Sequence, residues 1–219
     1  MIKLAIFDLD GTLIDSLGDL AAAVEYVLSK NGYPPNPFES YRYFVGNGTM
    51  KLIERALPAG TDETEVKRIH EIFSARYREH CLDLTKPYDG IPEMLERLKA
   101  AGIKAAVASN KPDEFSKKIV AQVFGDELFC SVHGKRDGVP TKPSREIVDS
   151  IMCEQGALAE ETIFIGDSDV DVQTARNAGI KCIGCAWGFR GAEELKNAGA
   201  DFIAYNSSDI EEFLLEAAE

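Results

Sequence analysis

The sequence predicts an α/β fold in which an all-helical segment is inserted near the start of a doubly wound parallel sheet. From residue 88 onward, short apolar runs alternate with single stretches of helical periodicity. That is the pattern of parallel strands joined by helices on both faces of a sheet. An earlier apolar run at residues 4–7 is too short for a helix. Residues 15–86, in between, show helical periodicity and no convincing strand.

The first strand leads into two carboxylates. Residues 4–7 are apolar on both faces, as in the buried strands of parallel sheets, so Asp8 should stand at a strand end where ligands gather. Gly11 lets the backbone turn, and Thr12 adds a hydroxyl beside the turn. An ordinary polar turn is the alternative, but Asp8 and Asp10 would repel each other unless a cation lies between them.

The inserted segment is predicted to contain three helices and one short stretch before the second helix. Asp15 or Ser16 can cap the first helix, and Asn31-Gly32 can end it. A loop at residues 46–48 precedes the second helix. The helices are expected at residues 15–30, 49–57 and 64–80, and the short stretch at residues 41–45.

The remaining chain is predicted to alternate between helix and strand. Helices are expected at residues 91–101, 113–124, 144–153, 170–178 and 192–198, and from 209. Strands are expected at residues 103–108, 129–133, 162–165, 181–186 and 201–204. Because the first strand belongs to this sheet, we expect an α/β core of residues 1–15 and 87–219 and a helical cap of residues 16–86.

Charge and hydropathy restrict the partners and the location. The chain has 219 residues, 45% of them hydrophobic, and a net charge of −13, which argues against nucleic acid or an anionic membrane as a partner. No secretory signal is visible, because the apolar start is interrupted by Lys3 and ends at Asp8. No uncharged apolar run approaches the roughly 20 residues of a membrane span. We therefore expect a cytoplasmic protein; the residues do not indicate its oligomeric state.

The five cysteines, at positions 81, 130, 153, 182 and 185, fit no disulfide framework. Cys182 and Cys185 have the spacing of a redox or zinc half-site. They lie in a predicted strand, however, where residues three apart point to opposite faces. We expect structural thiols.

Polar residues also follow two later strands. Ser109 and Asn110 offer a hydroxyl, an amide and backbone N–H groups to an oxyanion, although turn chemistry explains them equally. Lys142 precedes a helix, but Lys86 and Lys111 also stand before prolines, so at least two of these three lysines are expected to be structural.

Three acids, Asp167, Asp169 and Asp171, occupy a predicted strand-to-helix junction. This is more than helix capping needs, although Asp169 could be a helix cap that faces solvent.

Together, Asp8-Leu9-Asp10-Gly11-Thr12, Ser109-Asn110, Lys142 and the segment at residues 166–171 resemble, in order, the four motifs of the haloacid dehalogenase superfamily. Most of its members are phosphohydrolases. The resemblance extends over essentially the whole chain and implies a Rossmann-like core with a helical cap. Lys142 is preferred among the lysines because it falls between the second and third acid-bearing strands, as in the superfamily.

The resemblance implies a magnesium site. Asp8 and Asp167 would bind Mg²⁺ through their side chains and Asp10 through its backbone carbonyl, with Asp171 supporting the site. Four acids around a phosphate would be untenable without a divalent cation, and an oxygen-only donor set suits Mg²⁺.

The resemblance also implies roles in catalysis. Asp8 would attack phosphorus and form an aspartyl-phosphate, Asp10 would act as general acid and then general base, and Lys142 would neutralise charge. Dehalogenating relatives lack the second acid, so Asp10 favours phosphoryl transfer. The expected phosphate-binding residues are Gly11, Thr12, Ser109, Asn110 and Lys142.

Within the capped subgroup, Val45-Gly46-Asn47-Gly48 and Ala186-Trp187-Gly188 look like phosphoglycolate phosphatases, although each could be a plain turn. The expected substrate is thus a small phosphorylated metabolite, with 2-phosphoglycolate the best guess. Its carboxylate would need a cation or N–H donors, for which the candidates are Arg42, Lys51, Arg55 and the backbone of residues 46–48.

Other readings remain open. Sugar-phosphate phosphatases, pyrophosphatases and β-phosphoglucomutases also carry caps, but we do not recognise here the mutase residues that suit a sugar bisphosphate. A non-enzymatic alternative is a phospho-accepting, receiver-like domain or a degenerate binding domain. Receivers, however, have neither the Asp-x-Asp-Gly-Thr motif nor a helical cap.

Overall fold

The computed structural model describes residues 1–216 and contains one six-stranded sheet, in the order β5-β4-β1-β6-β7-β8. All neighbouring strands of this sheet pair in parallel, as the sequence predicted. β1 occupies a central position between β4 and β6, so the residues that follow it lie in the middle of the sheet edge. The strands are β1 (Leu4–Phe7), β4 (Lys104–Pro112), β5 (Ser131–Lys135), β6 (Thr162–Gly166), β7 (Lys181–Cys185) and β8 (Phe202–Ala204).

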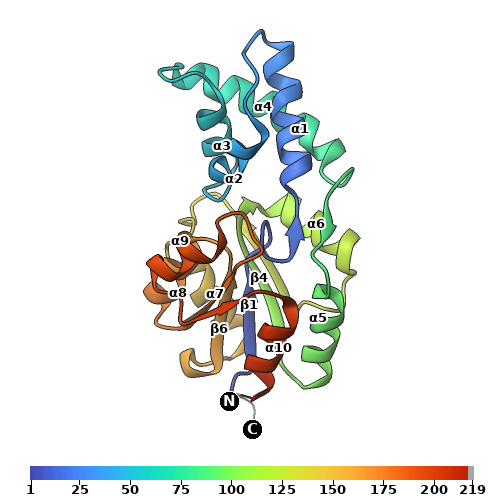
Figure 1. Cartoon of the computed structure of the whole chain (residues 1–219), viewed down its shortest axis with the longest axis vertical. Coiled ribbons are helices and arrows are strands. Elements are labelled where there is room, and N and C mark those ends of the chain that lie inside the picture. The colour runs from blue at the N-terminus through green and yellow to red at the C-terminus, as the bar shows by residue number, and fades with distance from the viewer. Residues whose placement is uncertain (217–219) are drawn as a thin grey trace.

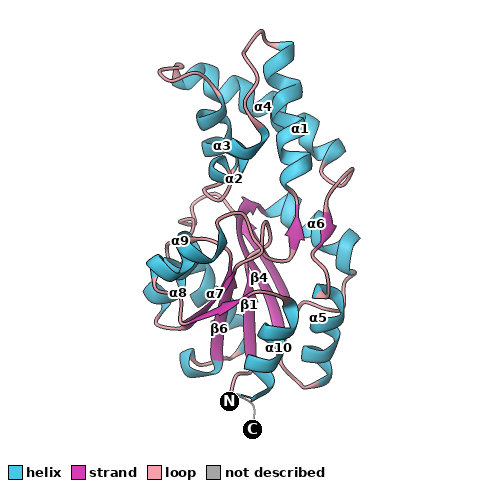
Figure 2. Ribbon diagram, viewed as in Figure 1, coloured by secondary structure: helices cyan, strands magenta, loops and turns pink. Residues whose placement is uncertain are grey.

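Helices cover both faces of this sheet (Figure 2). Alternate residues of β1 divide between two apolar clusters: Ala5 and Phe7 pack on one face, Leu4 and Ile6 on the other. The first cluster includes residues of α5 (Ile91–Ala100), α6 (Asp113–Phe124) and α10 (Ser207–Glu216). The second includes residues of α7 (Glu146–Gln155), α8 (Asp169–Ala178) and α9 (Gly191–Ala198). This arrangement is the doubly wound fold that the alternation of helices and strands predicted.

The inserted segment is helical and stands over the edge of the sheet where the strands end (Figure 1). The longest of its helices, α1 and α4, pack against each other, and α3 packs against α4. Among residues 1–216, no helix is long and apolar enough to cross a membrane. The helices of the segment are α1 (Leu17–Lys30), α2 (Tyr41–Phe44), α3 (Thr49–Ala56) and α4 (Glu63–His80), and short 3₁₀ turns lie at Phe38–Ser40 and, in the core, Ala159–Glu161.

The sequence indicated no convincing strand in residues 15–86, but the structure has a short strand at each end of this stretch. β2 (Ile14–Asp15) and β3 (Lys86–Pro87) form a two-residue antiparallel ribbon at the point where the chain leaves and re-enters the core. Strands of two residues show no periodicity, and the pairing joins residues that are far apart in sequence, so no local pattern could reveal it. The expected cap boundaries, 15/16 and 86/87, fall on this ribbon.

Several element boundaries differ from the prediction by one or two residues, and the end of β4 differs by more. β4 continues through the polar residues Ser109, Asn110 and Lys111 to Pro112, because these side chains are buried against the inserted segment and neighbouring loops. β5 and α7 each begin two residues later than expected. In the sequence, a run of polar residues after a strand looks like a turn. That these residues are buried and continue the strand depends on tertiary contacts that the local sequence does not show.

The cysteine pair behaves as its spacing predicted. Cys182 belongs to the cluster on the α8 face and Cys185 to the cluster on the opposite face. All five cysteines are free thiols, and burial raises the pKa of both Cys182 and Cys185. The two thiols are therefore packed core residues of a strand.

Candidate active site

Three carboxylates converge at the edge of the sheet. Asp8 follows β1, Asp167 follows β6, and Asp171 lies in the first turn of α8; each offers an oxygen within 4.8 Å of the others. All three side chains are buried. Burial, with Asp171 nearby, raises the pKa of Asp8 to about 6 despite Lys142, and burial with the neighbouring acids also raises the pKa of Asp167. The site thus concentrates more negative charge than its own residues neutralise.

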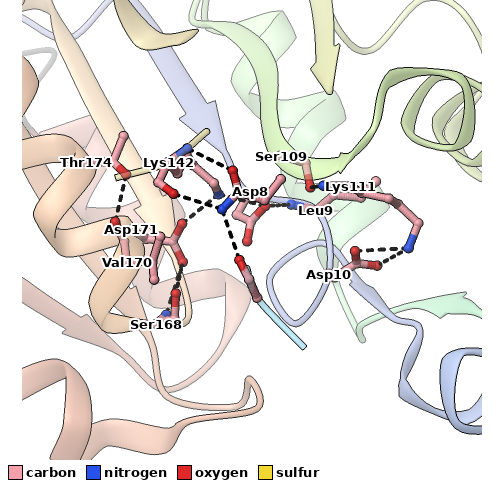
Figure 3. Close-up of polar contacts among 12 residues, drawn as sticks. Asp8, Leu9, Asp10, Ser109, Lys111, Lys142, Ser168, Val170, Asp171 and Thr174 are labelled. Atoms are coloured by element: carbon pink, nitrogen blue, oxygen red, sulfur yellow. Dashed lines mark hydrogen bonds and ion pairs between the residues drawn. The ribbon is translucent and has the colours of Figure 1, made fainter. Parts of the chain in front are cut away.

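One lysine serves two of these acids. Lys142 Nζ lies 2.9 Å from Asp8 Oδ1 and 2.7 Å from Asp171 Oδ1 (Figure 3). Burial alone would lower the pKa of Lys142, but Asp171 and Asp8 outweigh burial and raise it. The Asn110 side chain holds the backbone of Lys142 on both sides: its Oδ1 accepts from the Lys142 N–H at 2.8 Å, and its Nδ2 donates to the Lys142 carbonyl at 3.1 Å. The second and third predicted motifs therefore meet directly.

Asp10 has a lysine of its own. Lys111 Nζ lies 2.8 Å and 3.0 Å from the two carboxylate oxygens of Asp10, which also accepts a hydrogen bond from the Ser16 hydroxyl. Figure 3 shows Asp10 turned toward Lys111 and away from Asp8. On its other side, Lys111 Nζ lies 4.9 Å from the centre of the Tyr77 ring in α4. Of the three Lys-Pro lysines, Lys111 and Lys142 both contact site acids, Lys111 as the ion-pair partner of Asp10.

Backbone groups approach the acids closely. A Cβ on Gly11 would lie 2.4 Å from Asp167 Oδ2, and one on Gly188 would lie 2.2 Å from Asp167 Cβ. The Phe189 N–H donates to Asp167 Oδ2 at 2.7 Å. Only glycine therefore fits at either position. Nothing in the sequence around Phe189 indicated that its backbone would hold Asp167.

The acid cluster fits a divalent metal. Asp8, Asp167 and Asp171 place three buried carboxylates around one ammonium group, that of Lys142, which leaves negative charge uncompensated. Buried charges of like sign are tolerated when a metal neutralises them. The donors are all oxygens, which suits hard cations rather than zinc or copper.

The start of α8 explains the role of the remaining acid. Ser168, not Asp169, is the N-cap residue, and its backbone N–H and hydroxyl both donate to Asp171 Oδ2, at 3.1 Å and 2.7 Å. Asp169 instead accepts from the Gln173 side chain at 3.2 Å. The sequence-based alternative that Asp169 caps the helix is wrong, and Asp171 is fixed by both Ser168 and Lys142.

A cavity extends from the acids to the inserted segment, with an empty volume of about 530 Å³ including its mouth. Two hydrogen bonds join the core to the glycine loop of the segment, residues Val45–Gly48. Asn110 Nδ2 donates to the Gly46 carbonyl at 3.0 Å, and Arg190 Nη2 donates to the Val45 carbonyl at 3.0 Å. Core and segment therefore both form its walls. The lining residues are Asp8, Asp10, Leu20, Val45, Gly46, Gly48, Thr49, Leu52, Ser109, Asn110, Lys111, Asp167, Ser168, Phe189 and Arg190.

Three of the five expected phosphate-binding residues, Gly11, Thr12 and Lys142, are not among the residues that line this cavity. Thr12 is fully buried, and its hydroxyl has no hydrogen-bond partner among residues 1–216; its carbonyl accepts from Trp187 Nε1 at 3.2 Å. Gly11 contributes the close approach to Asp167 described above. Ser109 lines the cavity, and its Oγ accepts from the Lys111 N–H at 3.2 Å.

The side chains expected to bind a substrate carboxylate also lie elsewhere. Lys51 pairs with Glu54 on the surface, and Arg55 donates to the Tyr43 and Phe44 carbonyls and to Asn47. Arg42 lines a separate hollow beside Trp187. None of these three side chains lines the cavity, whereas the glycine loop does. The arginine of the lining is Arg190, which no sequence pattern indicated.

Comparisons with known proteins agree with this geometry. Residues 5–185 match the family model of haloacid dehalogenase-like hydrolases. The chain is 36% identical over 192 residues to a phosphoglycolate phosphatase of Pseudomonas putida, covering 85% of this chain and 70% of that protein. It is also 31% identical over 214 residues to an N-acetylmuramic acid 6-phosphate phosphatase of Pseudomonas aeruginosa, covering 95% and 93%. A crystal structure from Lactobacillus delbrueckii, provisionally named a phosphoglycolate phosphatase, superposes with a TM-score of 0.91 at 31% identity and covers 97% of this chain and 98% of that one.

Proposed function

We propose, from the premise that this chain belongs to the haloacid dehalogenase-like hydrolase family and is a phosphatase, that its substrate is 2-phosphoglycolate. The reaction would pass through an aspartyl-phosphate on Asp8. The observation that carries the proposal is the convergence of Asp8, Asp167 and Asp171, two of which pair with Lys142, beside a cavity that Asp8 and Asp167 line. In the proposed function these residues would serve as nucleophile, metal ligands and a cation for the phosphate oxygens.

Mg²⁺ is the proposed cofactor. Asp8 and Asp167 would hold it with their side chains, Asp10 with its backbone carbonyl, and Asp171 would support the site through Lys142 and Ser168. When bound, the ion offsets the negative charge of the carboxylates and of the substrate phosphate.

Asp8 is the proposed nucleophile. Its carboxylate oxygen attacks phosphorus and the ester P–O bond breaks, while Asp10, which has left Lys111 and taken up a proton from solvent, gives that proton to the leaving oxygen. Asp10 then takes a proton from water as the water oxygen attacks phosphorus, which frees Asp8 and releases phosphate. Lys142, Ser109 and the Asn110 N–H neutralise charge on the phosphoryl oxygens. For this, the Asp10 side chain must turn from Lys111 toward the ester.

The helical cap, residues 16–86, is the proposed solvent shield. An aspartyl-phosphate is readily hydrolysed, and a cavity roofed by the Val45–Gly48 loop limits access of bulk water to it. The cap then also supplies the wall that faces the rest of the substrate. This assigns the cap and the core of residues 1–15 and 87–219 to different tasks.

A sugar phosphate is the second candidate substrate, because one relative is named an N-acetylmuramic acid 6-phosphate phosphatase. The test is phosphate release from 2-phosphoglycolate, sugar phosphates, pyrophosphate and p-nitrophenyl phosphate, with and without Mg²⁺. Adding glucose 1,6-bisphosphate tests for the mutase alternative. We expect the highest kcat/KM with 2-phosphoglycolate. A higher kcat/KM with a sugar phosphate would make that compound class the assigned substrate. Absence of phosphate release from every compound would favour a binding domain.

A further inference from the structure

Arg190 occupies an unusual position for a charged side chain. It follows β7 and stands at the start of α9, and its side chain, which lines the cavity, is 12% exposed. Nη2 donates to the Val45 carbonyl at 3.0 Å, and the guanidinium lies 5.2 Å from the centre of the Tyr43 ring. A core residue thus holds its charge against the cap loop.

The charge of Arg190 is less compensated than that of the two site lysines. Lys142 contacts Asp8 and Asp171, and Lys111 contacts both oxygens of Asp10. Arg190 forms one ion pair, with Glu194, whose carboxylate lies 3.6 Å from Nε and so beyond hydrogen-bond distance. A guanidinium has five N–H donors, and the described residues accept one hydrogen bond from it, at a neutral carbonyl.

We propose that Arg190 binds a carboxylate of the substrate and restricts the enzyme to small phosphate monoesters that carry one, an inference that rests on the proposed phosphatase function. A guanidinium can give two parallel hydrogen bonds to a carboxylate. A neutral sugar in the same place would leave these donors without a charged partner. A second phosphate would add negative charge to a cavity that already contains Asp8, Asp10 and Asp167.

A purely structural role for Arg190 makes a different prediction. If the side chain only fastened the cap loop through the Val45 carbonyl, its loss would slow every substrate equally. A carboxylate-binding role instead affects one substrate and acts mainly on KM. The two roles therefore separate when two substrates differ only at the carboxylate.

Ethyl phosphate is such a partner for 2-phosphoglycolate, because a methyl group replaces the carboxylate. For Arg190→Gln we expect KM for 2-phosphoglycolate to rise about 10- to 100-fold, the range expected for losing hydrogen bonds between charged groups, with kcat/KM for ethyl phosphate within about twofold of wild type. Arg190→Lys should restore part of the loss. Arg145→Gln, which removes an exposed arginine paired with Asp149, is the matched control and should change neither substrate. Equal losses for both substrates would overturn the proposal.

Binding without turnover separates this inference from the proposed function. In an Asp8→Asn background, calorimetry with Mg²⁺ should show 2-phosphoglycolate binding more tightly than ethyl phosphate, and Arg190→Gln should abolish the difference. A preference that survives Arg190→Gln overturns the role of Arg190. Conversely, an Arg190-dependent preference in a protein whose wild type releases no phosphate would uphold the carboxylate site and refute the phosphatase proposal.

Discussion

Lys111 and Asp10, 101 positions apart in the chain, form a buried ion pair in which Nζ contacts both carboxylate oxygens, at 2.8 Å and 3.0 Å. Asp8, two residues before Asp10, has a different lysine, Lys142. The two acids of the first motif therefore have separate environments. Asp8 belongs to the acid cluster with Asp167 and Asp171, whereas Asp10 contacts Lys111, which in turn lies against the Tyr77 ring of the cap.

The Lys111–Asp10 pair should contribute strongly to stability. Lys111→Met would leave the Asp10 carboxylate with only the Ser16 hydroxyl among the contacts described above, and the free energy of unfolding should fall by about 3 kcal/mol. Adding Asp10→Asn should recover much of the loss, because no unpaired charge would remain. Urea denaturation of the single and double variants measures this coupling. Lys51→Met, which breaks an exposed pair, should cost no more than about 1 kcal/mol; equal costs for the two lysines would contradict the prediction.

Asp8→Asn should abolish turnover and leave the fold intact. The amide keeps the shape of the side chain and can still accept from the Leu9 N–H, which donates to Asp8 Oδ1 at 2.7 Å, but it is no longer a carboxylate nucleophile. We expect phosphate release to drop by at least about a thousandfold, since removing a catalytic nucleophile can cost roughly a millionfold in kcat. Circular dichroism should match that of wild type. Activity within tenfold of wild type would remove Asp8 from the nucleophile role.

Mg²⁺ should stabilise the protein more at pH 7.5 than at pH 5. The pKa of Asp8 is raised to about 6 in the fold, so the metal-free protein loses stability as pH rises through that value and the buried carboxylate ionises. Bound Mg²⁺ offsets this loss, while at pH 5 it must displace protons. At a concentration a hundredfold above Kd, the gain should be about 2.7 kcal/mol. Thermal unfolding with and without Mg²⁺ at both pH values measures it.

Asp8→Asn should reduce the effect of Mg²⁺ on the unfolding temperature at both pH values. A shift that is larger at pH 5, or unchanged in Asp8→Asn, would argue against a metal at this cluster.

Gly188→Ala should damage the site through Asp167. The added Cβ would lie 2.2 Å from Asp167 Cβ and 2.5 Å from the Gly11 carbonyl, so the backbone of one loop must shift. We expect a loss of about 3 kcal/mol in the free energy of unfolding and a weaker response to Mg²⁺. Gly102→Ala is the control, because its Cβ would meet nothing within 4 Å and only the positive φ costs stability, about 1–2 kcal/mol. Similar losses in both would contradict the steric argument.

The sequence predicted those parts of the site that depend on local pattern. A short apolar run places Asp8 at a strand end, and another does the same for Asp167. The parallel arrangement then brings these ends to one edge of the sheet. Strand ends, helix stops and the order of motifs are all features of neighbouring residues, which explains why the prediction was accurate there.

Long side chains that reach across the structure could not be predicted in this way. Lys111 resembled the lysine of an ordinary Lys-Pro turn, and its contact with Asp10 exists only because β4 lies beside β1 and the cap helix α4 covers it. Arg190 likewise acts on a loop 145 residues away. The arginine and lysine candidates within the cap do not line the cavity, because their side chains contact surface or cap groups instead.

The ribbon of β2 and β3 has a consequence for how such a protein can diversify. Because Ile14–Asp15 and Lys86–Pro87 are hydrogen-bonded neighbours, the residues between them leave the sheet and return to it at one place. An inserted segment whose two ends are neighbours can become longer, become shorter or be replaced without displacing a strand of the sheet. Changes in the inserted segment can thus alter substrate specificity while the catalytic residues of the core stay in place.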